Sequence, residues 1–212
     1  MTSPPDPGRK DPAPGPTLGL VLAAGAARRF GSPKQVAFFR GRPLVLWSVH
    51  VLRAGGIDRV MLAVGAHQMQ VRAAVDRVVT ARDIVMVPDW EEGMSASLRA
   101  GVQAAAQRGA GAVMVVLADQ PLLSDRAVAR MLGAADEDRS ASVLRAAYAD
   151  GRPGHPVLLR ADTFDQVATL RGDQGARALT GVQIRDVDCA SLGSSADVDT
   201  PADLLRIDVD PD

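Results

Sequence analysis

The sequence lacks pairs of cysteines, has few aromatic side chains (3%), and contains no apolar run near the roughly 18 residues that span a bilayer. Its single cysteine, Cys189, excludes an intrachain disulfide and a cysteine-rich zinc site, as is usual in a reducing cytosol. The N-terminus also lacks the apolar core of a secretory signal. We therefore expect a cytoplasmic protein that does not enter a membrane.

Net charge is also nearly absent. The 24 Lys and Arg residues and the 25 Asp and Glu residues give a formal charge of -1 at pH 7. Such a chain has no general attraction for nucleic acid or anionic membranes, so phosphate binding must come from local groups, and we expect a small ligand. Lysine is scarce: only Lys10 and Lys34 occur among the 24 cations, which draws attention to Lys34.

Proline is concentrated at the start of the chain. Six of the 14 prolines lie in residues 1–17, which have almost no large apolar side chain. Because such a segment cannot offset the entropy of ordering, we expect a disordered, proline-rich leader. Residues 18–212 are long enough for one full core and short for two, which predicts a single domain.

Strand and helix patterns alternate through the first half of the chain. Apolar runs indicate strands, helically spaced apolar residues indicate helices, and glycines end several of them. This rhythm predicts an α/β fold with a Rossmann-like, doubly wound, mostly parallel sheet. The expected strands cover 18–24, 58–65, 83–88 and 111–119, and the expected helices cover 43–56, 67–77, 95–109 (capped by Ser95) and 124–135.

The second half of the chain is less regular. Residues 142–160 contain two apolar segments around a Gly/Pro turn, which predicts an antiparallel addition at the edge of the parallel sheet. We expect helical segments near 161–170 and 175–180, a strand over 183–188, and a short helix after Pro201.

Small residues, glycine and cations follow the first expected strand. Ligands bind at the carboxyl edge of open α/β sheets, where free backbone N–H groups and cations can hold phosphate oxygens. The spacing matches neither the Walker A motif nor G-x-G-x-x-G, and an ordinary connecting loop is the alternative interpretation. The candidate residues are Leu22, Ala23, Ala24, Gly25, Arg29 and Lys34.

Three carboxylates are candidates for holding a metal ion. Asp119 ends the strongest apolar strand, and Asp197 and Asp199 precede a Thr-Pro helix start far downstream. Hard oxygen ligands from separate segments suit Mg²⁺, which usually takes one or two carboxylates together with substrate phosphates. Each aspartate could instead cap a helix or a turn.

Three further segments could contact a ligand. Gly93 and Ser97 lie at the start of the alanine-rich helix, where hydroxyls and free amides could read a base or hold an anion. His155 occupies a Gly-His-Pro turn, and Arg177 follows a Gly-Asp-Gln-Gly loop. A histidine in such a turn is more often structural than catalytic, and the loop could be only a tight turn.

Taken in order, these segments resemble the MobA-like nucleotidyltransferases, and among them the molybdenum cofactor cytidylyltransferases. The family motif L-A-A-G-x-S-x-R-M-G, followed by Pro-Lys, stands here at 22–31 and 33–34, with Ala27 in place of serine and Phe30 in place of methionine. The narrower likeness comes from Pro-Asp-Trp at 88–90, the segment 93–97, L-x-x-D-x-P at 117–121, the turn at 154–156 and D-x-D-T-P at 197–201.

The resemblance implies an enzyme that transfers CMP from CTP to the terminal phosphate of molybdenum-loaded molybdopterin. Pyrophosphate is released, and a molybdoenzyme or its chaperone is a possible recipient of the cytosine dinucleotide cofactor. The roles it implies are triphosphate binding by Arg29 and Lys34, Mg²⁺ binding by Asp119 and Asp199, nucleotide binding by residues 22–25, Gly93 and Ser97, and acceptor binding by His155 and Arg177.

Alternative functions stay open at this point. The same fold could use another nucleotide, such as GTP, or another acceptor, such as a sugar or alcohol phosphate, because base choice depends on few contacts. A non-catalytic carrier of the cofactor is a second alternative. A nicotinamide-dependent redox relative is a third, although no G-x-G-x-x-G supports it.

Overall fold

The computed structural model describes residues 15–149 and 151–209 of the 212-residue chain. Most of the predicted leader, residues 1–14, lies outside these ranges. Its last residue, Thr17, belongs to the first strand instead, where it pairs with Ala112. The sheet therefore begins one residue earlier than the predicted domain boundary.

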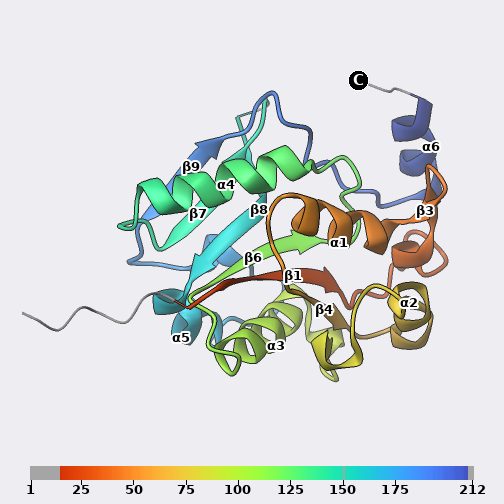
Figure 1. Cartoon of the computed structure of the whole chain (residues 1–212). Helices are drawn as coiled ribbons and strands as arrows, with labels where there is room; N and C mark the ends of the chain where they lie inside the picture. The colour runs from red at the N-terminus through yellow and green to blue at the C-terminus, as the bar shows by residue number, and fades with distance from the viewer. Residues whose placement is uncertain (1–14, 150, 210–212) are drawn as a thin grey trace, which may run out of the picture.

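A seven-stranded sheet forms the centre of the molecule, in the order β5-β4-β1-β6-β8-β7-β9 (Figure 1). The first four strands of this order run parallel, and β9 runs parallel to β7. Only β8 is antiparallel to its neighbours β6 and β7. The strands are β1 (Thr17–Ala23), β4 (Val60–Val64), β5 (Ile84–Met86), β6 (Ala112–Leu117), β7 (Val143–Ala147), β8 (Pro153–Arg160) and β9 (Ile184–Asp188).

The predicted α/β class with a mostly parallel sheet is confirmed, but the antiparallel strand does not lie at the edge of the sheet. β8 lies inside it, between β6 and β7, and β9 forms the edge. Burial explains this order: residues 156–159 of β8 are buried, whereas four of the five residues of β9 are not. A polar strand suits an edge, where charged side chains also discourage pairing with other chains.

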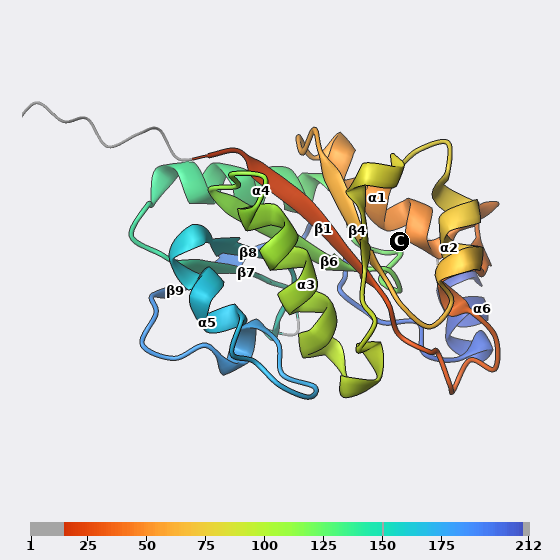
Figure 2. The same cartoon turned by 90° about the horizontal axis from the view of Figure 1, so that it is seen from below.

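Helices cover both faces of the sheet (Figures 1 and 2). α1 (Leu44–Ala54) and α4 (Asp125–Glu137) lie over one face, and α3 (Met94–Ala106) and α5 (Phe164–Val167) lie over the other. α2 (Gln68–Val75) contacts α1, and α6 (Pro201–Val209) packs near the hairpin of β2 (Phe38–Phe39) and β3 (Arg42–Pro43). Among the described residues, none of the helices has the length and apolarity needed to cross a membrane.

Several predicted helix details differ from the structure. Residues 161–170 contain only a short 3-10 turn and the four-residue α5, and 175–180 contain the 3-10 helix η5 (Ala176–Ala178). Ser95 does not cap α3: Gly93 is the N-cap, and Ser95 is fully buried in the first turn. The backbone N–H of Ser95 donates to Gly172 O at 3.0 Å, so a neighbouring loop satisfies the amide that a cap would otherwise serve.

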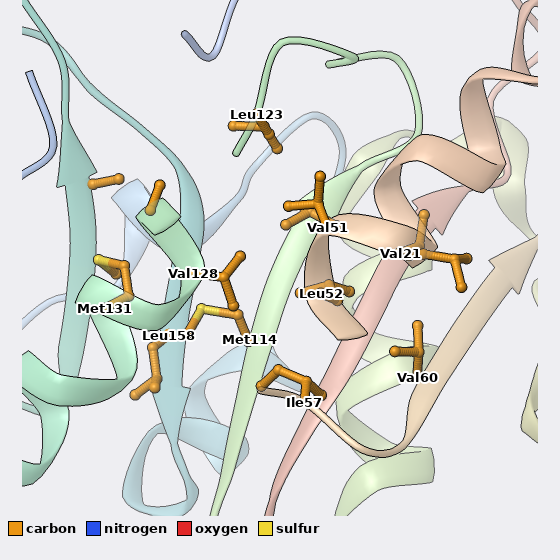
Figure 3. Packing of buried hydrophobic residues seen from close by; sticks show 14 of the residues in the cluster. Val21, Val51, Leu52, Ile57, Val60, Met114, Leu123, Val128, Met131 and Leu158 are labelled. Atoms are coloured by element: carbon orange, nitrogen blue, oxygen red, sulfur yellow. The ribbon is translucent and has the colours of Figure 1, made fainter. Parts of the chain in front are cut away.

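Side chains of the central strands alternate between two cores. Leu20 and Leu22 of β1 pack on the α3 side, and Val21 packs on the α1 and α4 side. Figure 3 shows Met114 of β6 close to Leu52 of α1 and Val128 of α4. Because helices cover both faces, the strands are continuously apolar rather than alternating.

The close packing of α3 on β1 predicts an unequal response to two glycine substitutions. A Cβ on Gly101 of α3 would overlap the buried side chain of Leu20, whereas a Cβ on Gly133 of α4 would meet nothing within 4 Å. Gly101→Ala should therefore lower the free energy of unfolding by about 1–3 kcal/mol. Gly133→Ala should raise it by up to about 1 kcal/mol, because alanine is the better helix former. Urea denaturation of both variants measures this, and equal effects would contradict it.

Candidate active site

The small-residue loop after β1 is held in place by two side chains. Gln35 Nε2 donates to Ala23 O at 3.3 Å and to Gly25 O at 2.7 Å. His67 Nε2 lies 3.0 Å from Ala26 O. These contacts fix the shape of the loop at the carboxyl end of β1, the edge of an open α/β sheet at which ligands bind. The contacted carbonyls of the loop are already engaged, whereas its outer face remains available for a ligand.

Lys34 lies between two of the predicted metal-binding carboxylates. Its Nζ is 2.5 Å from Asp119 Oδ2, at the end of β6, and 3.1 Å from Asp199 Oδ1, just before α6. Arg29 completes the cluster, with one guanidinium nitrogen 2.9 Å from Asp199 Oδ2. The structure thus brings four predicted site residues, from three separate segments, into direct contact.

The electrostatics of the cluster keep Lys34 charged. Burial disfavours the ammonium, but the charge and hydrogen bonds of Asp119 and Asp199 outweigh this and raise the pKa of Lys34 above its usual 10.5.

Beside the cluster, burial and then the like charge of Asp119 raise the pKa of Asp197 above its usual 3.8. Gln120 Nε2 donates to Asp197 Oδ1 at 2.8 Å and to Ser195 O at 2.9 Å, which anchors this segment beside Asp119.

The carboxylates fit a divalent cation that arrives with phosphates. Asp119 Oδ1 is buried and has no hydrogen-bond partner among the residues that the structure describes, so it is an oxygen ligand still unused. The described part of the chain contains no group of three or more His, Cys, Asp or Glu residues placed to hold a metal. Two aspartates, Asp119 and Asp199, are nevertheless enough for Mg²⁺, which completes its shell with substrate phosphates and water.

A cavity of about 280 Å³ opens at this cluster, and we call it the phosphate cavity. The cationic residues and the turn of the loop form its wall. Its lining residues are Leu22, Ala23, Gly25, Ala27, Arg28, Arg29, Lys34, Gln35, Ala118, Asp119 and Asp199.

A second cavity, of about 410 Å³, adjoins the first, and we call it the base cavity. Its lining residues include Ala24, Trp90, Gly93, Met94, Ser97 and Asp173. Gly93 is required here: its φ is 117°, and a Cβ would lie 2.5 Å from Asp173 Oδ1 and 2.7 Å from Gly172 O. The loop after Arg171 therefore closes directly over the start of α3.

A third cavity, of about 680 Å³, contains both predicted acceptor residues, and we call it the acceptor cavity. His155 and Arg177 line it together with Arg145 and Arg152, over an apolar floor that includes Leu98 and Val157. Burial, with the charge of Arg177 as a smaller cause, lowers the pKa of His155 to about 4, so its imidazole is neutral near pH 7. Arg177 is fixed by a 2.6 Å hydrogen bond to Pro153 O.

The three cavities meet at one place. Leu22 lines all of them, and Asp119 lines both the phosphate and base cavities. Met94 and Asp173 line both the base and acceptor cavities. One ligand in the base and phosphate cavities and another in the acceptor cavity would therefore touch near the end of β6.

Several residues in the site were missed by sequence reasoning. Gln35 and Gln120 carry no local signal except their position directly after Lys34 and Asp119. Arg99 is buried in part and donates to Asp89, Glu92, Ser95 and the carbonyl of Leu170, at distances between 2.5 and 3.1 Å. It ties the turn before α3 to the loop that closes over it, a long-range contact that no sequence motif shows.

Residues 19–187 match the MobA-like NTP transferase domain. The chain belongs to this family. It is therefore a nucleotidyltransferase. The three adjoining cavities fit this class of enzyme.

Relatives cover the MobA-like chain almost completely. Purine catabolism protein PucB of Bacillus subtilis is 26% identical over 207 residues, which are 89% of this chain and 95% of PucB. The crystal structure of Rv0371c from Mycobacterium tuberculosis superposes with a TM-score of 0.78 at 30% identity, covering 92% of this chain and all of that one. Another structure of Rv0371c, in complex with manganese, covers 91% of this chain and 97% of the other, with a TM-score of 0.70 at 27% identity.

The contributions of Lys34 and Asp119 to the free energy of unfolding should be strongly coupled. Their side chains are only 14% and 17% exposed, so removing the Lys34 charge leaves Asp119 without its cation in a poorly solvated site, and removing the Asp119 charge leaves Lys34 with Asp199 alone. A double-mutant cycle with Lys34→Met and Asp119→Asn should give a coupling energy of about 1–3 kcal/mol. Arg130 and Glu137, which are 3.8 Å apart and far more exposed, serve as the control pair and should couple by less than about 0.5 kcal/mol. A similar coupling for both pairs would argue against a special role for the cluster.

The neutral state of His155 predicts a pH dependence of stability. Its pKa is about 4 in the folded protein and about 6.5 in an unfolded chain, so between these values only the unfolded state takes up the proton. The free energy of unfolding should therefore fall as the pH is lowered from 6.5 to 4, by up to about 3 kcal/mol from this residue alone. In His155→Gln this loss should disappear, whereas His50→Gln, at an exposed position, should keep it. Urea denaturation at pH 7, 6 and 5 tests this, and parallel curves for wild type and His155→Gln would refute it.

Proposed function

We propose that this MobA-like nucleotidyltransferase transfers CMP from CTP to the terminal phosphate of molybdenum-loaded molybdopterin and releases pyrophosphate. The observation that carries the proposal is the junction of the three cavities at Leu22, beside Asp119, which lines the phosphate and base cavities. A nucleotide that fills the base and phosphate cavities presents its α-phosphate at the mouth of the acceptor cavity.

The charged cluster supplies the triphosphate site. Arg29 and Lys34 would exchange their carboxylate partners for phosphate oxygens, with the N–H groups of the loop at 22–25 as further donors. Asp119 and Asp199 would hold Mg²⁺, for which Asp119 Oδ1 already offers an unused oxygen. The ion, when bound, would neutralise charge that develops on the triphosphate.

The base cavity supports a nucleotide that is held mainly by backbone groups. Gly93 and Ser97 line it beside Trp90, whose indole ring is close to Gly65 and offers an apolar surface for a base. The preference for cytosine comes from the motif likeness in this segment and in the Gly-His-Pro turn. It is the part of the proposal that the first experiment addresses directly.

The acceptor cavity suits a large, anionic, flat molecule. At about 680 Å³ it lies within the usual range for cofactor sites, and its apolar floor and polar rim match a heterocycle with a phosphate. Neutral His155 and Arg177 would place the acceptor. Because the acceptor phosphate is already ionised near pH 7, its oxygen can attack the α-phosphorus as the bond to the β-phosphate breaks, and no general base is needed.

The proposal is tested in two steps. Selective thermal stabilisation by CTP, enhanced by Mg²⁺, is expected from a panel of CTP, GTP, ATP, UTP and NADPH; a ligand at about 100 times its dissociation constant adds about 2.7 kcal/mol. Pyrophosphate should then form only when molybdenum-loaded molybdopterin is added. In Asp119→Asn, which keeps the side-chain shape, turnover should fall at least about 1,000-fold.

Other outcomes of these experiments would change the substrate, the acceptor or the class of function. Selective stabilisation by another triphosphate would keep the reaction class and change the substrate, and turnover with a sugar or alcohol phosphate would change the acceptor. Ligand binding without pyrophosphate release would indicate a carrier. Stabilisation by NADPH alone would indicate redox chemistry and overturn the proposal.

A further inference from the structure

The cations of the phosphate cavity are not equally committed to protein partners. Arg29 is paired with Asp199, and Lys34 is paired with both Asp119 and Asp199. Arg28, by contrast, makes no hydrogen bond or ion pair with any residue that the structure describes. Three cations and two carboxylates line this cavity, so its excess positive charge belongs to Arg28.

Arg28 also occupies the boundary between two cavities. It lines the phosphate cavity and the base cavity, together with Leu22, Gly25, Ala27 and Asp119. A nucleotide that spans both cavities must place the phosphate nearest its ribose at this boundary. The exposed side chain of Arg28 is free to turn toward that phosphate, because no protein contact has to be broken first.

The residue before Arg28 departs from the family motif. Ala27 stands where the motif has serine, and it lines the same two cavities. A serine hydroxyl there would be a hydrogen-bond donor for a phosphate, and alanine removes it. The motif leaves the next position unspecified, and this chain has an arginine in it.

We propose that Arg28 binds the nucleoside triphosphate at the boundary of the two cavities and compensates for the hydroxyl that Ala27 lacks. A planar guanidinium can donate two parallel hydrogen bonds to phosphate oxygens, which makes it a stronger contact than one hydroxyl. The inference rests on the nucleotide-binding part of the proposed function and is independent of the acceptor.

Calorimetric titration of CTP and cytidine into Arg28→Gln tests the assignment. The substitution removes the charge and keeps a polar side chain, and the melting temperature should not change because no contact is lost. The dissociation constant for CTP should rise about 10-fold or more, as expected for the loss of a charged hydrogen bond, and that for cytidine should stay within about twofold. Arg139→Gln is the matched control, since Arg139 is also exposed and lines none of the three cavities.

Adding Ala27→Ser to Arg28→Gln should recover part of the lost CTP affinity. A loss of CTP affinity no larger than in Arg139→Gln, or an equal loss for cytidine, would overturn the role of Arg28. No recovery in the double variant would overturn the compensation. If the wild type prefers another triphosphate, the proposed cytosine preference fails, and the same ratios measured with that triphosphate and its nucleoside still decide the role of Arg28.

Discussion

The contact of the Lys34 ammonium with Asp119 and Asp199 is the interaction on which the candidate active site depends. It joins three segments that are distant in sequence: the loop after β1, the end of β6 and the approach to α6. Without the cation, two carboxylates would face one another in a partly buried place and repel. The same charges that hold these segments together are those to which the proposed function assigns the triphosphate and the metal ion, so the proposed site is assembled without its ligands.

A second long-range contact shapes the other side of the site. Arg99 joins the turn before α3 to the carbonyl of Leu170, and the following loop passes so close to Gly93 that a side chain would not fit there. Asp173 of this loop lines both the base and acceptor cavities. The two cavities therefore share a wall, which Arg99 holds against α3.

The sequence predicted the parallel half of the fold well because buried strands and amphipathic helices leave strong local patterns. The hairpin of β2 and β3 was not predicted, since strands of two residues have no period to detect. The interior place of β8 depends on how the burial of β8 compares with that of the other strands, which no local pattern contains. Ser95 does not cap α3, and its backbone N–H donates to the carbonyl of Gly172, which is distant in sequence. Among the predicted site residues, Arg29, Lys34, Asp119 and Asp199 lie together. The hydrogen bonds that hold the neighbouring segments, from Gln35 to the loop after β1 and from Gln120 to Ser195 and Asp197, are tertiary contacts that no sequence motif shows.

The acceptor cavity draws its parts unevenly from the chain. Its apolar floor includes Leu22, Val115 and Leu117, from the strands that also carry the phosphate site, whereas most of its polar lining, including Arg145, His155, Arg177 and Asp197, comes from residues 145–197. Under the proposed function, divergence within this later stretch would change the acceptor and leave the nucleotide site unchanged. Such an arrangement allows a family to inherit one transfer chemistry while its members diversify in what they modify.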